Sequence, residues 1–494
     1  MPLALKTYKE LLVNGLQYIR DHGELFAGVD KDRLNVQIDA VHHADNVTEL
    51  GALATLPTPN KNMGYTPIQP LTEAPELSTC IPFGQGTIGW YFMYGQMEGQ
   101  NNFHAAFTVI LFRIELAAPE VVADMQIAPR KSVLWSLAGG VGFHRPRSHK
   151  EHKTRTKTPD EKQPELEEEW YALPYSNTRG EYECTGEHTF RVELNAKDAP
   201  HLKEFTLISP KAGDFRINLK YTTHKGRTVA LKARLNNQRP ATYNAPDGCV
   251  PVCYAGVGTL YWSYTRMLTE ARIKFPPFEA PKQFSQGLGW FDHQWMASGF
   301  MNNTLTRLTR KVQGLVTRPR LPRWIWLNLQ FYEPKTQWMI VKHLNGPLAE
   351  DQVLTADMVN LYDEKGAHYE TDLTVHIKVV QVHAVISETS GRSMFYPVKY
   401  AITIPDDTED GGTTYIMKAD FGNSVIYLPN GNMNWEGSGS LWNADETKRL
   451  GNCFLEANQF QPIDEIVSTT LKLAGFDDDK DDDPSNDWEI FRPT

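Results

Sequence analysis

Cysteine, long apolar runs and secretion signals are scarce or missing in this sequence. Its 494 residues include only five cysteines, an odd number at scattered positions, which is typical of reduced thiols in an intracellular protein. No stretch reaches the roughly 18 apolar residues that a membrane-spanning helix needs, and residues 1–26 lack the apolar core of a signal peptide. We therefore expect a cytoplasmic protein with no integral membrane segment.

An excess of positive charge is also missing. Fifty Lys and Arg residues stand against 60 Asp and Glu residues, which gives a formal net charge of −10. Because nucleic acids and anionic membranes attract basic proteins, this balance argues against either as the main partner. Aromatic residues are abundant at 11%; they favour strands and line apolar ligand sites. A hydrophobic small molecule is the partner we expect, and the oligomeric state is left open.

The common catalytic and cofactor motifs are absent too. There is no G-x-S-x-G, H-E-x-x-H or P-loop. GQGTIG (84–89) matches a dinucleotide fingerprint, but the strand-like WYFMYGQM follows it where a helix is required. Cys249 and Cys253 have no second pair or nearby histidine at zinc spacing. We expect neither a cofactor nor a bound metal.

The ends of the chain and one internal block differ from the rest. Apolar residues recur every three or four positions within residues 1–30, which predicts an amphipathic helix packed on the fold. A peripheral membrane contact of this helix is the alternative. Residues 144–169 form a basic run followed by an acidic run with almost nothing apolar, and residues 476–494 are strongly acidic. Both compositions predict solvated segments, the first a disordered insertion.

From about residue 80 onward, short apolar and aromatic runs alternate with Gly, Pro, Asn and Asp. Alternation within the runs indicates strands, and few helical patterns interrupt them. Many short strands at near-regular spacing predict an all-β protein made of barrels or sandwiches.

One stretch places two ionisable residues among aromatic rings: QGLGWFDHQW, residues 286–295. In a strand, Trp290 and Asp292 face one side, whereas Phe291, His293 and Trp295 face the other. Asp292 and His293 can therefore enter one pocket only if a bulge or bend intervenes, which Gly287 and Gly289 make feasible.

Several short landmarks resemble the hydroxyneurosporene synthase and AttH family, the lipocalin-like carotenoid hydratases. They occur in the family's order and comprise GWYFMYGQMEGQNNFHAAFTVILFRIEL (89–116), YWSYTRM (261–267), GLGWFDHQW (287–295), PRWIWLNLQF with QWMIVKHL (322–344), and NWEGSGSLW with RLGNCFLEANQF (434–460). The opening E-W-W-Y is shortened here to Gly89-Trp90-Tyr91, and Met296 replaces a customary glycine.

The resemblance implies two consecutive lipocalin-like antiparallel β-barrels, which we place at residues 31–278 and 279–475. It also implies a ligand cavity in the first barrel or between the two, apolar polyene or polyketide substrates, and no cofactor. Terpenoid cyclases and fungal Diels–Alderases share this fold class, so the fold alone does not choose the reaction.

Protonating an isolated alkene requires a carboxylic acid that keeps its proton near neutral pH, and burial raises a carboxyl pKa enough for this. Asp292 is our candidate proton donor, and His293 would orient it or act as the base. Aromatic faces stabilise a developing cation. The candidate substrate-binding residues are Trp90, Tyr91, Tyr261, Tyr264, Trp290, Trp295, Trp324 and Trp326. Glu436 and Glu456 are carboxylates inside apolar strands, for which we expect cross-strand bonding.

The leading hypothesis is thus a cofactor-independent enzyme that hydrates, cyclises or isomerises an isoprenoid or polyene. Three alternatives stay open. The chain could be a lipid carrier without chemistry, or a pericyclase that works by shape. Alternatively, the motif could be purely structural, with Asp292 capping a turn or paired to Arg266 or Arg272.

Overall fold

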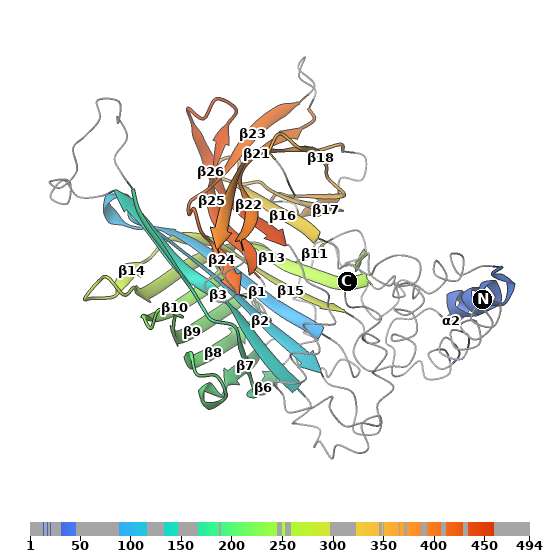
Figure 1. The fold of residues 1–494 in the computed structure, drawn as a ribbon, viewed down its shortest axis with the longest axis horizontal. Helices are drawn as coiled ribbons and strands as arrows, with labels where there is room; N and C mark the ends of the chain where they lie inside the picture. Colours follow the sequence, from blue (N-terminus) through green and yellow to red (C-terminus); the bar gives the residue numbers. More distant parts are fainter. Residues whose placement is uncertain are drawn as a thin grey trace.

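The computed structural model describes two antiparallel sheets and a helical N-terminal region (Figure 1). The described residues are 13, 17, 20, 31–45, 88–115, 133–146, 166–186, 189–244, 249–251, 258–296, 323–344, 348, 350–364, 366–369, 373–386, 393–406, 412–427 and 433–458.

The first sheet contains 15 strands in the order β4-β3-β2-β1-β15-β13-β10-β9-β8-β7-β6, with short strands added beside β3 and β13. Its strands are β1 (Ile88–Glu98), β2 (His104–Glu115), β3 (Val133–Pro146), β4 (Leu166–Ala172), β5 (Ser176–Thr178), β6 (Gly180–Gly186), β7 (Thr189–Leu194), β8 (Leu202–Lys211), β9 (Asp214–Thr222), β10 (Thr228–Asn237), β11 (Thr242–Tyr243), β12 (Cys249–Pro251), β13 (Gly258–Lys274), β14 (Lys282–Phe284) and β15 (Gly287–Met296).

The second sheet contains 11 strands in the order β18-β21-β22-β23-β25-β26-β16-β17-β19-β20, with β24 beside β25. Its strands are β16 (Arg323–Phe331), β17 (Gln337–Leu344), β18 (Val353–Thr355), β19 (Met358–Tyr362), β20 (Ala367–Tyr369), β21 (His376–Ile386), β22 (Ser393–Ile404), β23 (Thr413–Ala419), β24 (Val425–Tyr427), β25 (Met433–Asn443) and β26 (Arg449–Asn458). Both sheets curl as half-barrels, so the prediction of an all-β chain with two consecutive antiparallel sheets is confirmed.

Sequence alternation decides which strands are buried on one face and which on two. In β10, Val229, Leu231, Ala233 and Leu235 point inward while the residues that alternate with them are more exposed, as expected for a strand with one solvated face. In β15, by contrast, the residues from Trp290 to His293 are all buried. One face of β15 lies in the core of the first sheet, and the other is covered by the second sheet.

The layer between the two sheets is a third apolar cluster, which we call the seam. Its buried members come from both sheets: Phe92, Tyr94, Ile110, Ala138, Tyr261 and Trp290 from the first, and Trp326, Met339, Val341, Tyr362, Ile426 and Phe454 from the second. In Figure 1 the orange and red strands of the second sheet lie across this part of the first sheet. The seam therefore joins the sheets through aromatic packing.

Two boundaries differ from those expected from the sequence. The QGLGWFDHQW strand belongs to the first sheet, because β15 pairs with both β1 and β13. The break between the sheets thus falls after Met296 and not at residue 279. The ends of the expected disordered insertion 144–169 are strands: Arg145 of β3 lies opposite Glu167 of β4, and their side chains form an ion pair at 2.6 Å. Residues 147–165 and the acidic tail 476–494 lie outside the described residues.

The N-terminal region contains helix α2 (Lys31–His43), inside the range assigned to the first barrel. Most of the helix expected at 1–30 lies outside the described residues, but Val13, Gln17 and Arg20 are helical. Among the described residues, no helix is long and apolar enough to cross a membrane.

Candidate active site

Asp292 and His293 lie at the middle of β15, which pairs with β1 on one side and β13 on the other. Asp292 is opposite Phe92 of β1 and Ser263 of β13, and the pairing with β1 continues without interruption through His293. No bulge intervenes, so the two side chains point to opposite faces. Asp292 points into the seam and is 3% exposed; His293 points into the core of the first sheet and is 1% exposed.

The Asp292 carboxyl is held through one of its two oxygens. The Tyr261 hydroxyl donates a hydrogen bond to Oδ2 at 2.9 Å, and the Trp290 indole N–H donates to the same oxygen at 3.2 Å. Oδ1 is buried and has no hydrogen-bond partner among the described residues. A protonated carboxyl here carries its proton on Oδ1.

Burial raises the pKa of Asp292 well above its usual value of 3.8. The hydrogen bonds from Tyr261 and Trp290 oppose this shift, because they favour the charged form, whereas the charge of Glu456 adds to it. Burial is the largest of these influences, and it shifts the pKa in the direction that a proton donor requires.

Aromatic rings surround this acid on the seam side. The Trp290 and Trp326 rings lie edge to face with their centroids 5.4 Å apart, and Phe92 contacts Phe454 in the same way at 5.5 Å. Edge-to-face pairs of this kind present the negative face of a ring to its neighbour. The surroundings of Asp292 are therefore dry and rich in π-electron density.

Two more carboxyl groups reach the seam from the second sheet. Glu436 of β25 and Glu456 of β26 lie directly opposite each other. The Trp324 indole N–H donates to Glu456 Oε1 at 2.6 Å, while Glu436 is 1% exposed with Oε2 unpartnered among the described residues. Burial raises the pKa of both groups, and for Glu436 the charges of Glu456 and Asp292 raise it further.

His293 belongs to a different environment. Its ring stacks on Tyr91 with centroids 4.4 Å apart, and Nδ1 lies 3.0 Å from the Trp90 carbonyl oxygen. Burial lowers the pKa of His293 to about 3. The expected role of His293 as orienting group or base for Asp292 is thus corrected: it is a neutral, packed imidazole on the other face of the sheet.

The remaining predicted residues divide between these two faces. Trp90, Tyr261, Trp290, Trp324 and Trp326 belong to the seam with Asp292. Tyr91 and Tyr264 belong to the core of the first sheet with His293, which removes them from the candidate site. Trp295 is in β15, but its side chain lies outside the described set.

The sequence suggested Arg266 or Arg272 as an ion-pair partner of Asp292, but both have other surroundings. Arg266 donates to the Phe331 carbonyl oxygen at 3.2 Å. Arg272 lines a shallow groove of about 380 Å³ on the outer face of the first sheet, together with Arg216, Lys232 and Arg234. Asp292 is bonded instead to neutral donors in the seam.

The two ends of the seam can be told apart, because β1 and β16 face each other across it and pack residue by residue in the same order. The Phe92 and Trp326 centroids are 6.1 Å apart, and the Tyr94 hydroxyl donates to Asn328 Oδ1 at 3.3 Å. Trp90 lies two residues before Phe92 and Trp324 two residues before Trp326, so both lie toward the same end of the seam, and both are only partly buried. We call this end the rim.

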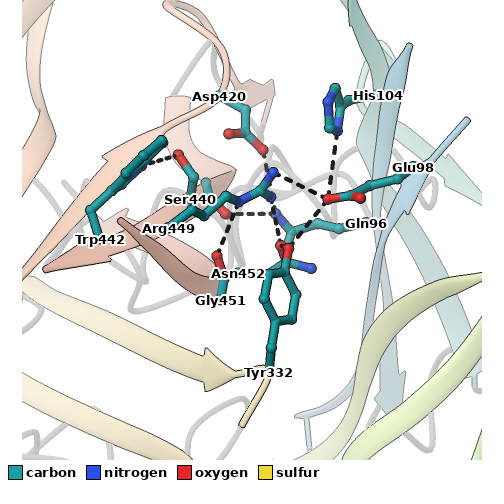
Figure 2. A network of polar contacts seen from close by, with 11 residues as sticks. Gln96, Glu98, His104, Tyr332, Asp420, Ser440, Trp442, Arg449, Gly451 and Asn452 are labelled. Carbon is teal, nitrogen blue, oxygen red and sulfur yellow. Dashed lines mark hydrogen bonds and ion pairs between the residues drawn. The ribbon is translucent and has the colours of Figure 1, made fainter. Parts of the chain in front are cut away.

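A polar network closes the opposite end (Figure 2). Arg449 of β26 pairs with Glu98 of β1 at 3.1 Å and donates to Asn452 at 2.7 Å. The Tyr332 hydroxyl donates to Asn452 at 2.9 Å, and the Gln96 amide donates to the Gly439 carbonyl oxygen at 2.9 Å. The Arg449–Glu98 and Gln96–Gly439 contacts tie the two sheets together at this end of the seam.

Some of these features were not foreseen. Glu436 and Glu456 were recognised as carboxylates within apolar strands, but nothing in the sequence placed them near Asp292. The closing network of Gln96, Glu98 and Arg449 was missed entirely, since its members are ordinary polar residues at strand ends. Among the described residues, no group of three His, Cys, Asp or Glu side chains is arranged to hold a metal ion.

Comparison with known proteins gives structural matches only. No family model and no curated protein matches the chain. Solved structures that match include an AttH protein from Nitrosomonas europaea (13% identity, 80% of this chain and 99% of that chain, TM-score 0.46) and kievitone hydratase from Nectria haematococca (12% identity, 80% and 98%, TM-score 0.39). The hydroxyneurosporene synthase assignment stays a prediction.

Proposed function

We propose that this chain is a cofactor-independent enzyme that protonates a carbon–carbon double bond of a hydrophobic isoprenoid or polyene, with Asp292 as the acid. The observation that carries the proposal is the Asp292 carboxyl: it is buried among aromatic rings, bonded through Oδ2 and unpartnered at Oδ1. An acid of this kind keeps its proton at neutral pH and has an oxygen free to deliver it.

The surroundings of Asp292 suit the charge changes of such a step. When Oδ1 gives its proton to the alkene, negative charge develops on the carboxylate, and the Tyr261 and Trp290 donors on Oδ2 stabilise it. Positive charge develops on the substrate carbon, and aromatic rings such as the neighbouring Trp290 and Trp326 can stabilise a cation. Water addition, ring closure or proton loss then completes hydration, cyclisation or isomerisation.

The rim is the end of the seam at which we propose that an apolar substrate enters. Trp90 and Trp324 are partly buried there, and the network around Arg449 and Glu98 closes the far end. A long, thin isoprenoid entering between Trp90 and Trp324 would bring its leading double bond toward Asp292.

The test is turnover of Asp292→Asn against the full-length wild-type chain. Squalene, geranylgeraniol and lycopene are offered in micelles in D₂O buffer, and mass spectrometry follows added water, rearranged alkene and deuterium incorporation. We expect the variant to lose turnover by about 10²–10⁴-fold while keeping its thermal midpoint. Asp420→Asn is the matched control, because Asp420 is an acid of raised pKa that lies at the closed end.

The outcomes also separate the other functions. Equal turnover by Asp292→Asn and wild type contradicts the proposal. Tight probe binding without deuterium incorporation by the wild type indicates a carrier. A rate that depends on Trp290 and Trp326 but not on Asp292 indicates a pericyclase.

A further inference from the structure

Asp292 donates the first proton, but the second half of the reaction also needs a group that accepts a proton. After the cation forms, a proton must be removed either from the attacking water or from a carbon of the substrate. The neighbour that the sequence offered for this task, His293, faces the core of the first sheet. The acceptor must therefore come from another strand.

Glu456 reaches the same face from the opposite sheet. It lies beside Trp326 in the strand register, and the Trp326 ring contacts Trp290, which in turn donates to Asp292. Its charge is felt at Asp292, where it raises the pKa. Asp292 and Glu456 thus bracket the Trp290–Trp326 pair from the two sheets.

The position of Glu456 suits a proton acceptor better than that of Asp292. Its carboxyl is held in place by the Trp324 indole N–H at 2.6 Å, a bond that favours the charged form. Glu456 is also partly exposed, whereas Asp292 and Glu436 are almost fully buried. Water arriving at the rim meets Glu456 first.

Glu436 completes the arrangement from the neighbouring strand. Two carboxyls directly opposite each other do not readily ionise together. Glu436 is the more buried of the two, whereas Glu456 is partly exposed. A negative charge is therefore less costly on Glu456 than on Glu436.

Buried polar atoms on this stretch of the seam have no protein partner. The Trp326 indole N–H, Oδ1 of Asp292 and Oε2 of Glu436 all lack one among the described residues. Trp326 is 5% exposed. Since buried polar groups are nearly always satisfied, unpaired atoms from both sheets indicate a place that receives a polar guest such as water or a hydroxyl.

We propose that Glu456 is the proton acceptor of the reaction, positioned by the Trp324 indole N–H and lying opposite Glu436. This inference rests on the proposed function. In hydration, the π electrons of the alkene form a C–H bond with the Asp292 proton, and a water lone pair forms the C–O bond to the resulting cation. One water proton passes to Glu456; it returns to Asp292 through solvent before the next turnover, so the cycle consumes only alkene and water.

The inference is tested with Glu456→Gln and Asp292→Asn and the same probes in D₂O. In Glu456→Gln, Asp292 still protonates the alkene and can take a proton back. Deuterium should therefore continue to enter the recovered substrate while product falls by about 10²-fold or more. Asp292→Asn should lose both signals. Glu98→Gln, an acid in the closing network, is the control and should keep both.

Failure of the role of Glu456 and failure of the proposed function give different results. If Glu456→Gln makes product within twofold of wild type while Asp292→Asn is inactive, the role of Glu456 is overturned and the acid mechanism stands. If Asp292→Asn is active, the proposed function itself fails.

A measurement on the protein without substrate tests the role of Glu456 independently of turnover. The difference between the infrared spectra of wild type and Glu456→Gln, followed over pH, should show a carboxyl that ionises across the neutral range. A Glu456 that stays in one protonation state throughout that range contradicts the inference.

Discussion

Asp292 and His293 are neighbours in one strand, yet they belong to different layers of the molecule. The Asp292 carboxyl accepts from Tyr261 and Trp290 between the sheets, whereas the His293 ring stacks on Tyr91 inside the first sheet. Burial acts on both in the direction of neutrality: it raises the pKa of the acid and lowers that of the base. An acid–base pair in the sequence is thus divided between two layers of the fold, each with its own partners.

Tyr261→Phe should slow the reaction without damaging the fold. The change removes the donor to Asp292 Oδ2, which stabilises the carboxylate formed during proton transfer, and this is worth about 1–1.5 kcal/mol, or roughly a tenfold loss in kcat. Tyr264→Phe is the matched control, because Tyr264 lies on the same strand but in the core of the first sheet. Equal losses in both variants would contradict the assignment.

His293→Phe should affect stability and not turnover. Phenylalanine keeps the stacking on Tyr91 but loses the contact of Nδ1 with the Trp90 carbonyl oxygen, so we expect a loss of about 1 kcal/mol at neutral pH and kcat within twofold. A large loss of kcat in a folded variant would restore a catalytic role.

The penalty of His293→Phe should shrink on acidification. The folded-state pKa is about 3 against an ordinary 6.5, so the unfolded wild type takes up a proton that the folded one refuses. The wild type therefore loses stability as pH falls from 6.5 toward 3, at about 1.4 kcal/mol per pH unit at most. The phenylalanine variant lacks this loss. Denaturant unfolding of both proteins at several pH values checks the convergence.

The effect of Glu436→Gln on the free energy of unfolding should become more favourable as pH rises. The folded-state pKa of Glu436 is raised above 4.5 by burial, so its contribution is fully present below that pH. It is lost as pH rises through the folded-state pKa. Glutamine does not titrate, and the difference in unfolding free energy should move toward the variant between acid and neutral pH. A difference independent of pH would show that Glu436 is not held protonated.

Trp324→Phe should shift the pH–rate profile to higher pH. Without the indole N–H, Glu456 loses the hydrogen bond that favours its charged form, so a higher pH is needed to ionise it. Turnover at neutral pH should fall several-fold and recover at higher pH. Trp442→Phe is the control: its N–H donates to Ser440 at the closed end, and its loss should leave the profile in place.

The sequence predicts the parts of this architecture that depend on local alternation. The all-β fold, the strand through Asp292 and the opposite orientation of His293 all follow from a period of two. Which face meets a ligand depends on what covers it, and that is set by the packing of two sheets that no local pattern encodes. Tyr91 and Tyr264 were therefore grouped with Trp90 and Tyr261, although they point the other way.

Long-range register explains the rest of what was missed. Glu436 and Glu456 face each other because β25 and β26 pair at that position, and they approach Asp292 because Phe92 packs on Trp326 across the seam. The charged run 144–169 was expected to be entirely solvated. At its ends, however, Phe143 and Tyr171 are buried next to the polar residues, and these anchors continue the β3–β4 ladder into the run.

The pairing of β1 with β15 has a consequence for how the protein is made. In each sheet the earliest long strand pairs with the last one, β1 with β15 and β16 with β26, and these four strands carry Trp90, Asp292, Trp324 and Glu456. Contacts between distant segments form slowly, because the intervening chain must close a long loop first. The acid therefore acquires its dry surroundings only after both halves are complete, and the nascent chain carries Asp292 as an ordinary, water-exposed carboxylate.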